Sequence, residues 1–196
     1  MNLGISTGSS WSQKYTFNFP IGAGNSYSDL IIDGNYVHDT YTGGNEAITI
    51  SGRINRFQMT NNTIANVSFI GMDVIGKGAY YPENGIISGN DVSSVGFNPA
   101  DSGTTAIYID GAKNITIENN LVHDTDYNGI FVGNEDGGGY WAPPPAVVTD
   151  GVIIRRNKVW NNVHNIAIGG GFGGTSQNNR VVHNTAVTST TGNDSS

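Results

Sequence analysis

The amino-acid sequence predicts an all-β protein that folds as a parallel β-helix, with three strands per coil and about five to six coils. Asparagine recurs at intervals of about 30 residues, and short apolar strands flank each recurrence. The chain contains 28 Gly and 25 Asn, while only 13% of its residues are charged. Turn-forming residues at a fixed interval are typical of solenoids, in which one structural unit stacks on the next.

Six asparagines, here called the anchor asparagines, define the repeat. They are separated by 27, 28, 30, 37 and 27 residues. Stacked strands repeat at about 4.8 Å, and identical amide side chains at that spacing hydrogen-bond along the stack. We therefore expect a ladder of buried amides formed by Asn35, Asn62, Asn90, Asn120, Asn157 and Asn184.

Apolar and polar residues alternate around each anchor with the period of two that indicates β-strands. One inward apolar position lies three residues before the anchor, as at Ile32, and another lies two residues after it, as at Val37. After a polar turn a third strand follows in each coil. These third strands are expected at 47–51, 71–75, 106–110, 129–133 and 165–169.

The repeat also suggests the domain boundaries. Residues 15–188 form the expected β-helix, residues 1–14 an N-terminal cap or linker, and residues 189–196 a flexible tail. An uncapped solenoid end exposes strand edges that can pair with another chain. We therefore expect end-to-end self-association or continuation into a larger chain.

The charge balance excludes some partners. There are 9 Lys and Arg against 16 Asp and Glu, which gives a net charge of -7. Nucleic-acid binding needs clustered basic residues, so a nucleic-acid partner is not expected. No apolar run approaches the roughly 20 residues of a membrane-spanning helix, and the chain has no cysteine for disulfides.

Two His-Asp pairs, His38–Asp39 and His123–Asp124, occur in the near-identical segments NYVHDT and NLVHDT. The repeat places them in one column, three coils and therefore about 14 Å apart at about 4.8 Å per coil. Imidazole ligands lie about 2 Å from their metal, so the two pairs cannot share one ion. We interpret both pairs as structural turn residues.

The long insertions point to a different face. They flank the third strand of each coil, and the longest are residues 95–105 and 133–150. Insertions in solenoids often gather on a binding face, so we expect a groove whose floor is the outer face of the third strands. Ten residues line this floor: Thr49, Ser51, Asp73, Ile75, Tyr108, Asp110, Phe131, Gly133, Ala167 and Gly169.

Asp73, Tyr108, Asp110 and Lys113 are the candidate catalytic residues. Strand geometry puts the two carboxylates roughly 7–9 Å apart, a separation suited to an inverting pair across a glycosidic bond. Lys113 follows in a tight turn, where it could act as a base or neutralise a sugar acid.

Aromatic and acidic residues of the same region suggest ligand contacts. Phe131, Tyr140 and Trp141 offer flat faces for a sugar and are the candidate substrate-binding residues. The candidate metal ligands are carboxylates, the donors that Ca²⁺ prefers. They are Asp110, Glu135 and Asp136.

The asparagine-anchored coils resemble the right-handed parallel β-helix repeat family of the pectate-lyase-like superfamily, over roughly residues 15–188. This resemblance implies right-handed coils, an extracellular or cell-surface location, and a lyase, epimerase or hydrolase acting on acidic polysaccharides. In such a lyase a cation neutralises the uronate and a base removes the proton at C5.

The family's catalytic signatures are missing, so no catalytic residue is carried over from it. Two functions stay open, because fold alone does not fix function. One is an enzyme that acts on a uronate-containing polysaccharide by β-elimination or hydrolysis. The other is a non-catalytic glycan-binding or structural module of a larger extracellular protein.

Overall fold

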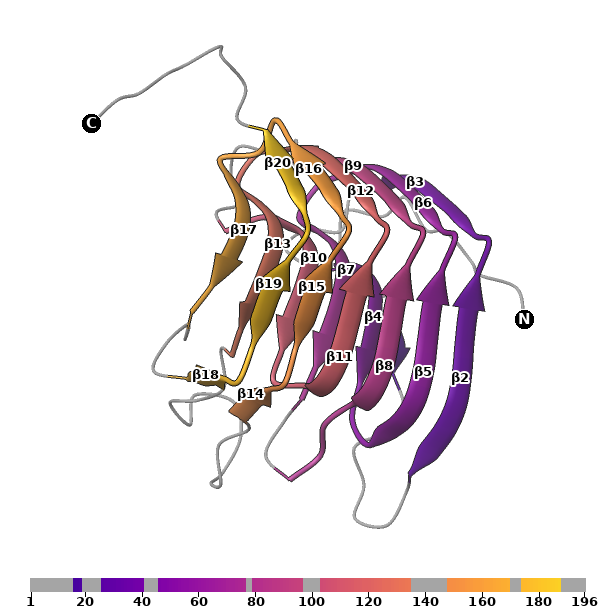
Figure 1. Ribbon diagram of the computed structural model, residues 1–196. Coiled ribbons are helices and arrows are strands. Elements are labelled where there is room, and N and C mark those ends of the chain that lie inside the picture. The colour runs from indigo at the N-terminus through magenta and orange to yellow at the C-terminus, as the bar shows by residue number, and fades with distance from the viewer. Residues whose placement is uncertain are drawn as a thin grey trace.

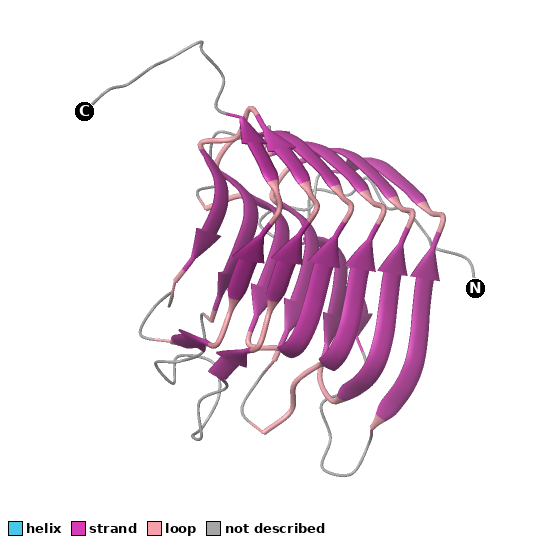
Figure 2. Ribbon diagram, viewed as in Figure 1, coloured by secondary structure: helices cyan, strands magenta, loops and turns pink. Residues whose placement is uncertain are grey.

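The computed structural model describes residues 16–18, 26–40, 46–76, 79–96, 103–134, 148–169 and 174–187. Within them the chain winds in coils, and strands from successive coils stack into three parallel sheets (Figures 1 and 2). Sheet A contains the third strands in the order β1 (Thr16–Asn18), β4 (Glu46–Ser51), β7 (Ile70–Ile75), β10 (Thr105–Asp110), β13 (Asn128–Gly133) and β17 (His164–Ile168).

Sheets B and C hold the strands before and after each anchor. Sheet B consists of β2 (Tyr27–Asp33), β5 (Ile54–Thr60), β8 (Glu83–Ser88), β11 (Lys113–Glu118), β14 (Val148–Asp150), β15 (Ile153–Arg155), β18 (Thr175–Gln177) and β19 (Arg180–Val182). Sheet C consists of β3 (Tyr36–Thr40), β6 (Thr63–Val67), β9 (Asp91–Val95), β12 (Leu121–Thr125), β16 (Lys158–Trp160) and β20 (Thr185–Val187). The described residues therefore form the expected three-stranded coils.

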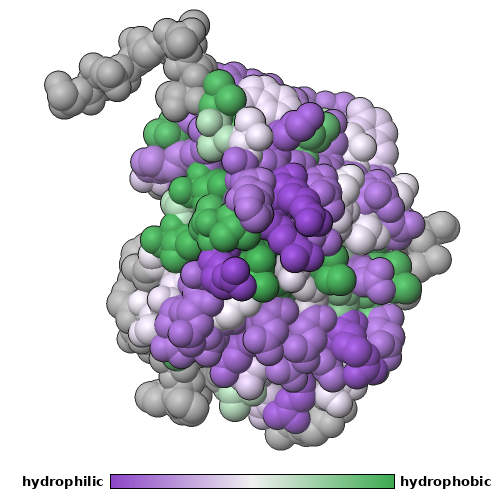
Figure 3. Space-filling view, viewed as in Figure 1, coloured by the Kyte–Doolittle hydropathy of each residue, from purple (hydrophilic) through white to green (hydrophobic). Residues whose placement is uncertain are grey.

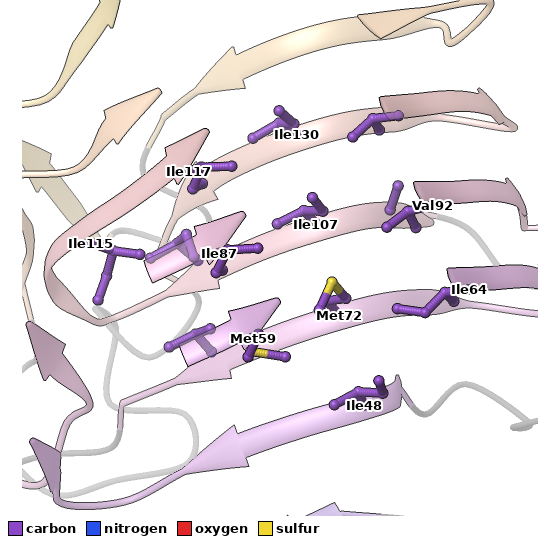
Figure 4. Close-up of a cluster of buried hydrophobic side chains, with 14 of the residues drawn as sticks. Ile48, Met59, Ile64, Met72, Ile87, Val92, Ile107, Ile115, Ile117 and Ile130 are labelled. Carbon is purple, nitrogen blue, oxygen red and sulfur yellow. The ribbon is translucent and has the colours of Figure 1, made fainter. Parts of the chain in front are cut away.

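The core is a set of aliphatic columns along the solenoid axis. Ile32 pairs in register with Met59, and Met59 pairs with Ile87, as the repeat predicts. Side chains of all three sheets point into the space that the sheets enclose (Figure 4). Those of the middle coils are fully buried, among them Met59, Ile64, Met72, Ile87, Ile107 and Ile117. Burial of these columns, at about 25 cal/mol per Å² of apolar surface, drives the coils together.

The anchor asparagines form the expected ladder at the turn between sheets B and C. Each Nδ2 donates to the Oδ1 of the next anchor over 2.9–3.0 Å, from Asn35 through to Asn184. The backbone N–H of each anchor donates to the same oxygen over 2.9–3.0 Å. The amides also donate to backbone carbonyls of the preceding coil, such as that of Ile32. The buried polar groups of this turn thereby satisfy one another.

Within a coil, residues with positive φ lie five positions apart, and equivalent ones stack from coil to coil in three left-handed columns. In the first coil they are Asp29, Gly34 and Asp39, with φ of 60°, 66° and 52°. Asn, Asp and Gly are the residues that enter this left-handed region most readily, and they occupy most of these positions. The third such column contains Asp39, Asn66, Ser94, Asp124 and Asn161.

The two ends of the stack differ. Ile32 and Val37 in the first described coil are only 4% and 3% exposed. In the last coil the inward Val181 is 46% exposed, whereas its register partner Ile154 is buried. A hollow of about 450 Å³ opens there, lined by Asn165, Ile166, Val181, Val182, His183, Asn184 and Ala186. Apolar surface gathers at this end, near β17 and β19 (Figure 3).

Candidate functional site

The outer face of sheet A brings four of the sequence-predicted residues together. Asp73 on β7 lies in register with Tyr108 on β10, and Tyr108 with Phe131 on β13. Asp110 lies two residues beyond Tyr108 and pairs with Ile75. Because Ile107 and Ile109 are buried in the core, strand alternation turns Tyr108 and Asp110 outward.

These outward side chains are covered. Asp73 is 2% exposed, Tyr108 3% and Asp110 6%, whereas a groove floor predicts exposed side chains at these positions. Thr49, which is in register with Asp73 on β4, is also buried. Asp and Glu side chains are seldom fully buried in proteins. The burial of two on neighbouring strands makes this face the candidate site.

An aromatic stack continues the site across the next strand. The rings of Tyr108 and Phe131 lie nearly parallel, with centroids 5.0 Å apart and an interplanar angle of 20°. Phe131 is half-buried. A Cβ at Gly133, the register partner of Asp110, would come within 2.9 Å of the Phe131 ring, so this ring lies close over the glycine. Aromatic surface therefore adjoins the carboxylates.

Lys113 lies beyond the floor, at the start of β11 in sheet B. Its Nζ sits 4.2 Å from the centroid of the Tyr81 ring. Two coils before Lys113, the Arg53 guanidinium lies 5.0 Å from the centroid of the Tyr80 ring. Sequence reasoning missed Arg53 and both tyrosines, although paired tyrosines in a long turn after a third strand are a visible signal.

The remaining predicted ligands, Glu135, Asp136, Tyr140 and Trp141, lie outside the described residues. Within the described ranges, no three His, Asp or Glu side chains are gathered so that they could hold a metal ion. The calcium site that includes Asp110 therefore stays a prediction.

The His-Asp pairs occupy sheet C, away from this face. His38 Nδ1 is 2.8 Å from Asp39 Oδ2, and His123 Nδ1 is 2.6 Å from Asp124 Oδ2. His123 also stacks on Trp160, with ring centroids 4.2 Å apart.

Both aspartates belong to the third left-handed column, which gives them a backbone role. Hydrogen bonds from His123 and then from Asn161 lower the pKa of Asp124. The registers of sheet C separate the two histidines by three coils, as the repeat predicts.

Comparison with known proteins agrees with this architecture. Residues 21–196 match the family described as the right handed beta helix region, and the chain belongs to this family. Its coils are therefore right-handed, as is usual for parallel crossovers. The chain is also 34% identical over 150 residues to the uncharacterized protein YwoF of Bacillus subtilis (strain 168).

That match covers 71% of this chain and 30% of YwoF, so the chain spans less than a third of its relative. Because YwoF is itself uncharacterized, the similarity supplies no activity. No solved structure gives a significant match. In the described part of the chain, no helix is long and apolar enough to cross a membrane.

Proposed function

We propose that the protein acts on an acidic, uronate-containing polysaccharide at the outer face of sheet A. The observation that carries this proposal is the pair of buried carboxylates, Asp73 and Asp110, on neighbouring strands. The Tyr108–Phe131 stack next to them supports it, because aromatic rings offer apolar faces with defined geometry to a ligand. Membership of the right-handed β-helix family is consistent with the proposal but does not specify a substrate.

Hydrolysis is the reaction that this carboxylate pair suits best. In an inverting mechanism one carboxyl group protonates the leaving oxygen while the other activates a water molecule, with the two groups about 6.5–9.5 Å apart. Strand geometry gives Asp73 and Asp110 a separation of roughly 7–9 Å. Burial favours the uncharged form of a carboxyl group, which is the form a general acid needs.

β-Elimination is the competing reaction. It needs a base for the C5 proton and a cation to neutralise the uronate. Lys113 is the candidate base or neutralising group, and Ca²⁺ held by Asp110, Glu135 and Asp136 is the candidate metal. Phe131, Tyr140 and Trp141 would contact the sugar. An extracellular or cell-surface location fits a polysaccharide substrate.

The two reactions give different products, so one assay separates them. Uronate polymers are incubated with the protein, with and without Ca²⁺, while new reducing ends and the ultraviolet absorbance of an unsaturated uronate are both followed. Hydrolysis releases reducing ends without the absorbance, whereas elimination produces both. We expect Asp73→Asn and Asp110→Asn to lower the rate by at least about a hundredfold each, because general acid–base groups contribute about 10²–10⁴-fold.

Wild-type protein that binds uronate polymers without cleaving them would instead identify a glycan-binding module. Cleavage that survives the double substitution Asp73→Asn with Asp110→Asn would refute the proposed site. Lys158→Gln, on the outer face of sheet C, is the matched control and should leave the rate unchanged.

A further inference from the structure

Two cation–tyrosine pairs line the corner between sheets A and B. The Arg53 guanidinium lies 5.0 Å from the Tyr80 ring centroid, and Lys113 Nζ lies 4.2 Å from the Tyr81 ring centroid. Arg53 follows β4, the two tyrosines follow β7, and Lys113 follows β10. The two pairs therefore span three consecutive coils, and the third strands of two of them, β7 and β10, carry the buried carboxylates.

The corner directly adjoins the candidate site. Gly76 N donates to the backbone oxygen of Asp110 over 2.7 Å. A Cβ at Gly76 would come within 1.9 Å of Gly111 O and 2.8 Å of Tyr81 Cβ. Tyr81 therefore packs against the turn that immediately follows Asp110, and the two pairs form the sheet B edge of the site.

The two cations of this corner contact aromatic rings, whereas two other basic residues form ion pairs with carboxylates. Arg56 and Arg155 are committed to carboxylates, at 2.8 Å from Asp29 and 2.7 Å from Glu118. Arg53, in contrast, lies over the face of an aromatic ring and is exposed to solvent. A cation on a ring face keeps its N–H groups available for an anion at its edge.

Lys113 is half-buried, and its register partners on the flanking strands are Glu83 and Asp150. These acids reduce the positive potential around Lys113, so Arg53 is the stronger of the two anion-binding groups. In a chain of net charge -7, the two cations provide a local attraction for an anionic ligand.

We infer that Arg53–Tyr80 and Lys113–Tyr81 are two anion subsites, which bind carboxylate or sulfate groups of one acidic glycan lying along the solenoid axis. The corners that carry Arg53 and Lys113 are two coils apart, or about 10 Å at about 4.8 Å per coil. An extended polyanion spans both subsites, whereas a single sugar acid occupies one. This inference rests on the proposed function for the place of the glycan, but it concerns recognition and not bond cleavage.

Calorimetric titration with three sets of oligosaccharides tests the inference: oligouronates, sulfated oligosaccharides and neutral oligosaccharides. The variants are Arg53→Gln, Lys113→Gln and their combination. The matched control is Lys158→Gln with Arg180→Gln, which removes two exposed cations from the outer faces of sheets C and B. We expect the combined variant to lose at least about tenfold in affinity, since each hydrogen bond between charged groups contributes about tenfold or more. The control should change affinity by less than about twofold.

Comparison of the oligosaccharide sets shows which anion is recognised, because the set that carries this anion binds most tightly. The affinity for that set should also fall as the salt concentration rises. Asp73→Asn with Asp110→Asn separates recognition from catalysis: it should abolish cleavage while anionic oligosaccharides still bind. Unchanged binding of anionic oligosaccharides to the combined Arg53 and Lys113 variant overturns the inference, even if the wild type cleaves them. Failure of the wild type to bind any anionic oligosaccharide overturns both the inference and the proposed function. Arg53→Gln and Lys113→Gln each change one solvent-accessible residue. Their affinities therefore test the inference even if the combined variant fails to fold.

Discussion

The asparagine ladder makes a sharp prediction for Asn120, which lies at its centre. The Asn120 side chain accepts from Asn90 N and Asn90 Nδ2, each over 2.9 Å, and is fully buried. Its own Nδ2 donates to Ile87 O over 3.0 Å and to Asn157 Oδ1 over 2.9 Å. Replacing Asn120 with alanine therefore removes four hydrogen bonds at a site where water cannot replace them.

The expected cost follows from the groups left behind. Asn90 N loses its acceptor, Asn90 Nδ2 loses one of its two acceptors, and Ile87 O loses a donor. Asn157 Oδ1 keeps a donor, because the backbone N–H of residue 120 still reaches it. At roughly 1–3 kcal/mol for each buried polar group without a partner, Asn120→Ala should lower the free energy of unfolding by about 3–6 kcal/mol.

Urea denaturation followed by circular dichroism measures this change. The control is Asn55→Ala, which removes only an exposed ladder contact, Asn84 Nδ2 to Asn55 Oδ1 at 2.8 Å, and should cost about 0.5 kcal/mol or less. Similar losses of stability for the two variants would show that the buried ladder is no more important than an exposed contact.

Two further predictions test the packing and the electrostatics of the coils. A Cβ at Gly85 would come within 2.1 Å of the buried Phe57 ring. Gly85→Ala should therefore destabilise the folded protein by about 1–3 kcal/mol, as measured by thermal denaturation. The control Gly169→Ala should leave the stability unchanged, because a Cβ there meets only one atom, at 3.9 Å. Equal melting temperatures would contradict this packing. The pKa of Asp124 is lowered in the folded protein, chiefly by the hydrogen bond from His123. The ionised carboxylate therefore stabilises the fold at a pH above its unfolded-state pKa of about 3.8. This contribution disappears as the pH falls through the lower pKa of the folded state. The stability gap between wild type and Asp124→Asn should therefore close on acidification below about pH 4, and a gap independent of pH would exclude this carboxylate as its source.

The sequence was sufficient to predict the coils and the register of the floor. The anchors stand out because an amide side chain that recurs once per coil can both donate and accept along the stack. The alternation around Ile107 and Ile109 is local to one strand, and it turns Tyr108 and Asp110 outward. The shared column of His38 and His123 followed from the same alignment.

Other features depend on contacts that the alternation does not encode. The first column of residues with positive φ begins with Asp29, Arg56 and Asn84. Because these residue types differ, the sequence contains no motif that predicts this column. The alternation predicts which side of the sheet Asp73 faces but not that it is 2% exposed. The Arg53–Tyr80 contact joins two turns of unequal length, so the interval between anchors does not predict it.

A crystal structure with a bound acidic oligosaccharide would show whether the outer face of sheet A is a glycan site. The protein to use is Asp73→Asn with Asp110→Asn, which should bind the sugar without cleaving it. We expect sugar density across β7, β10 and β13, with anionic groups toward Arg53 and Lys113. Density confined to the outer faces of sheets B or C would contradict it.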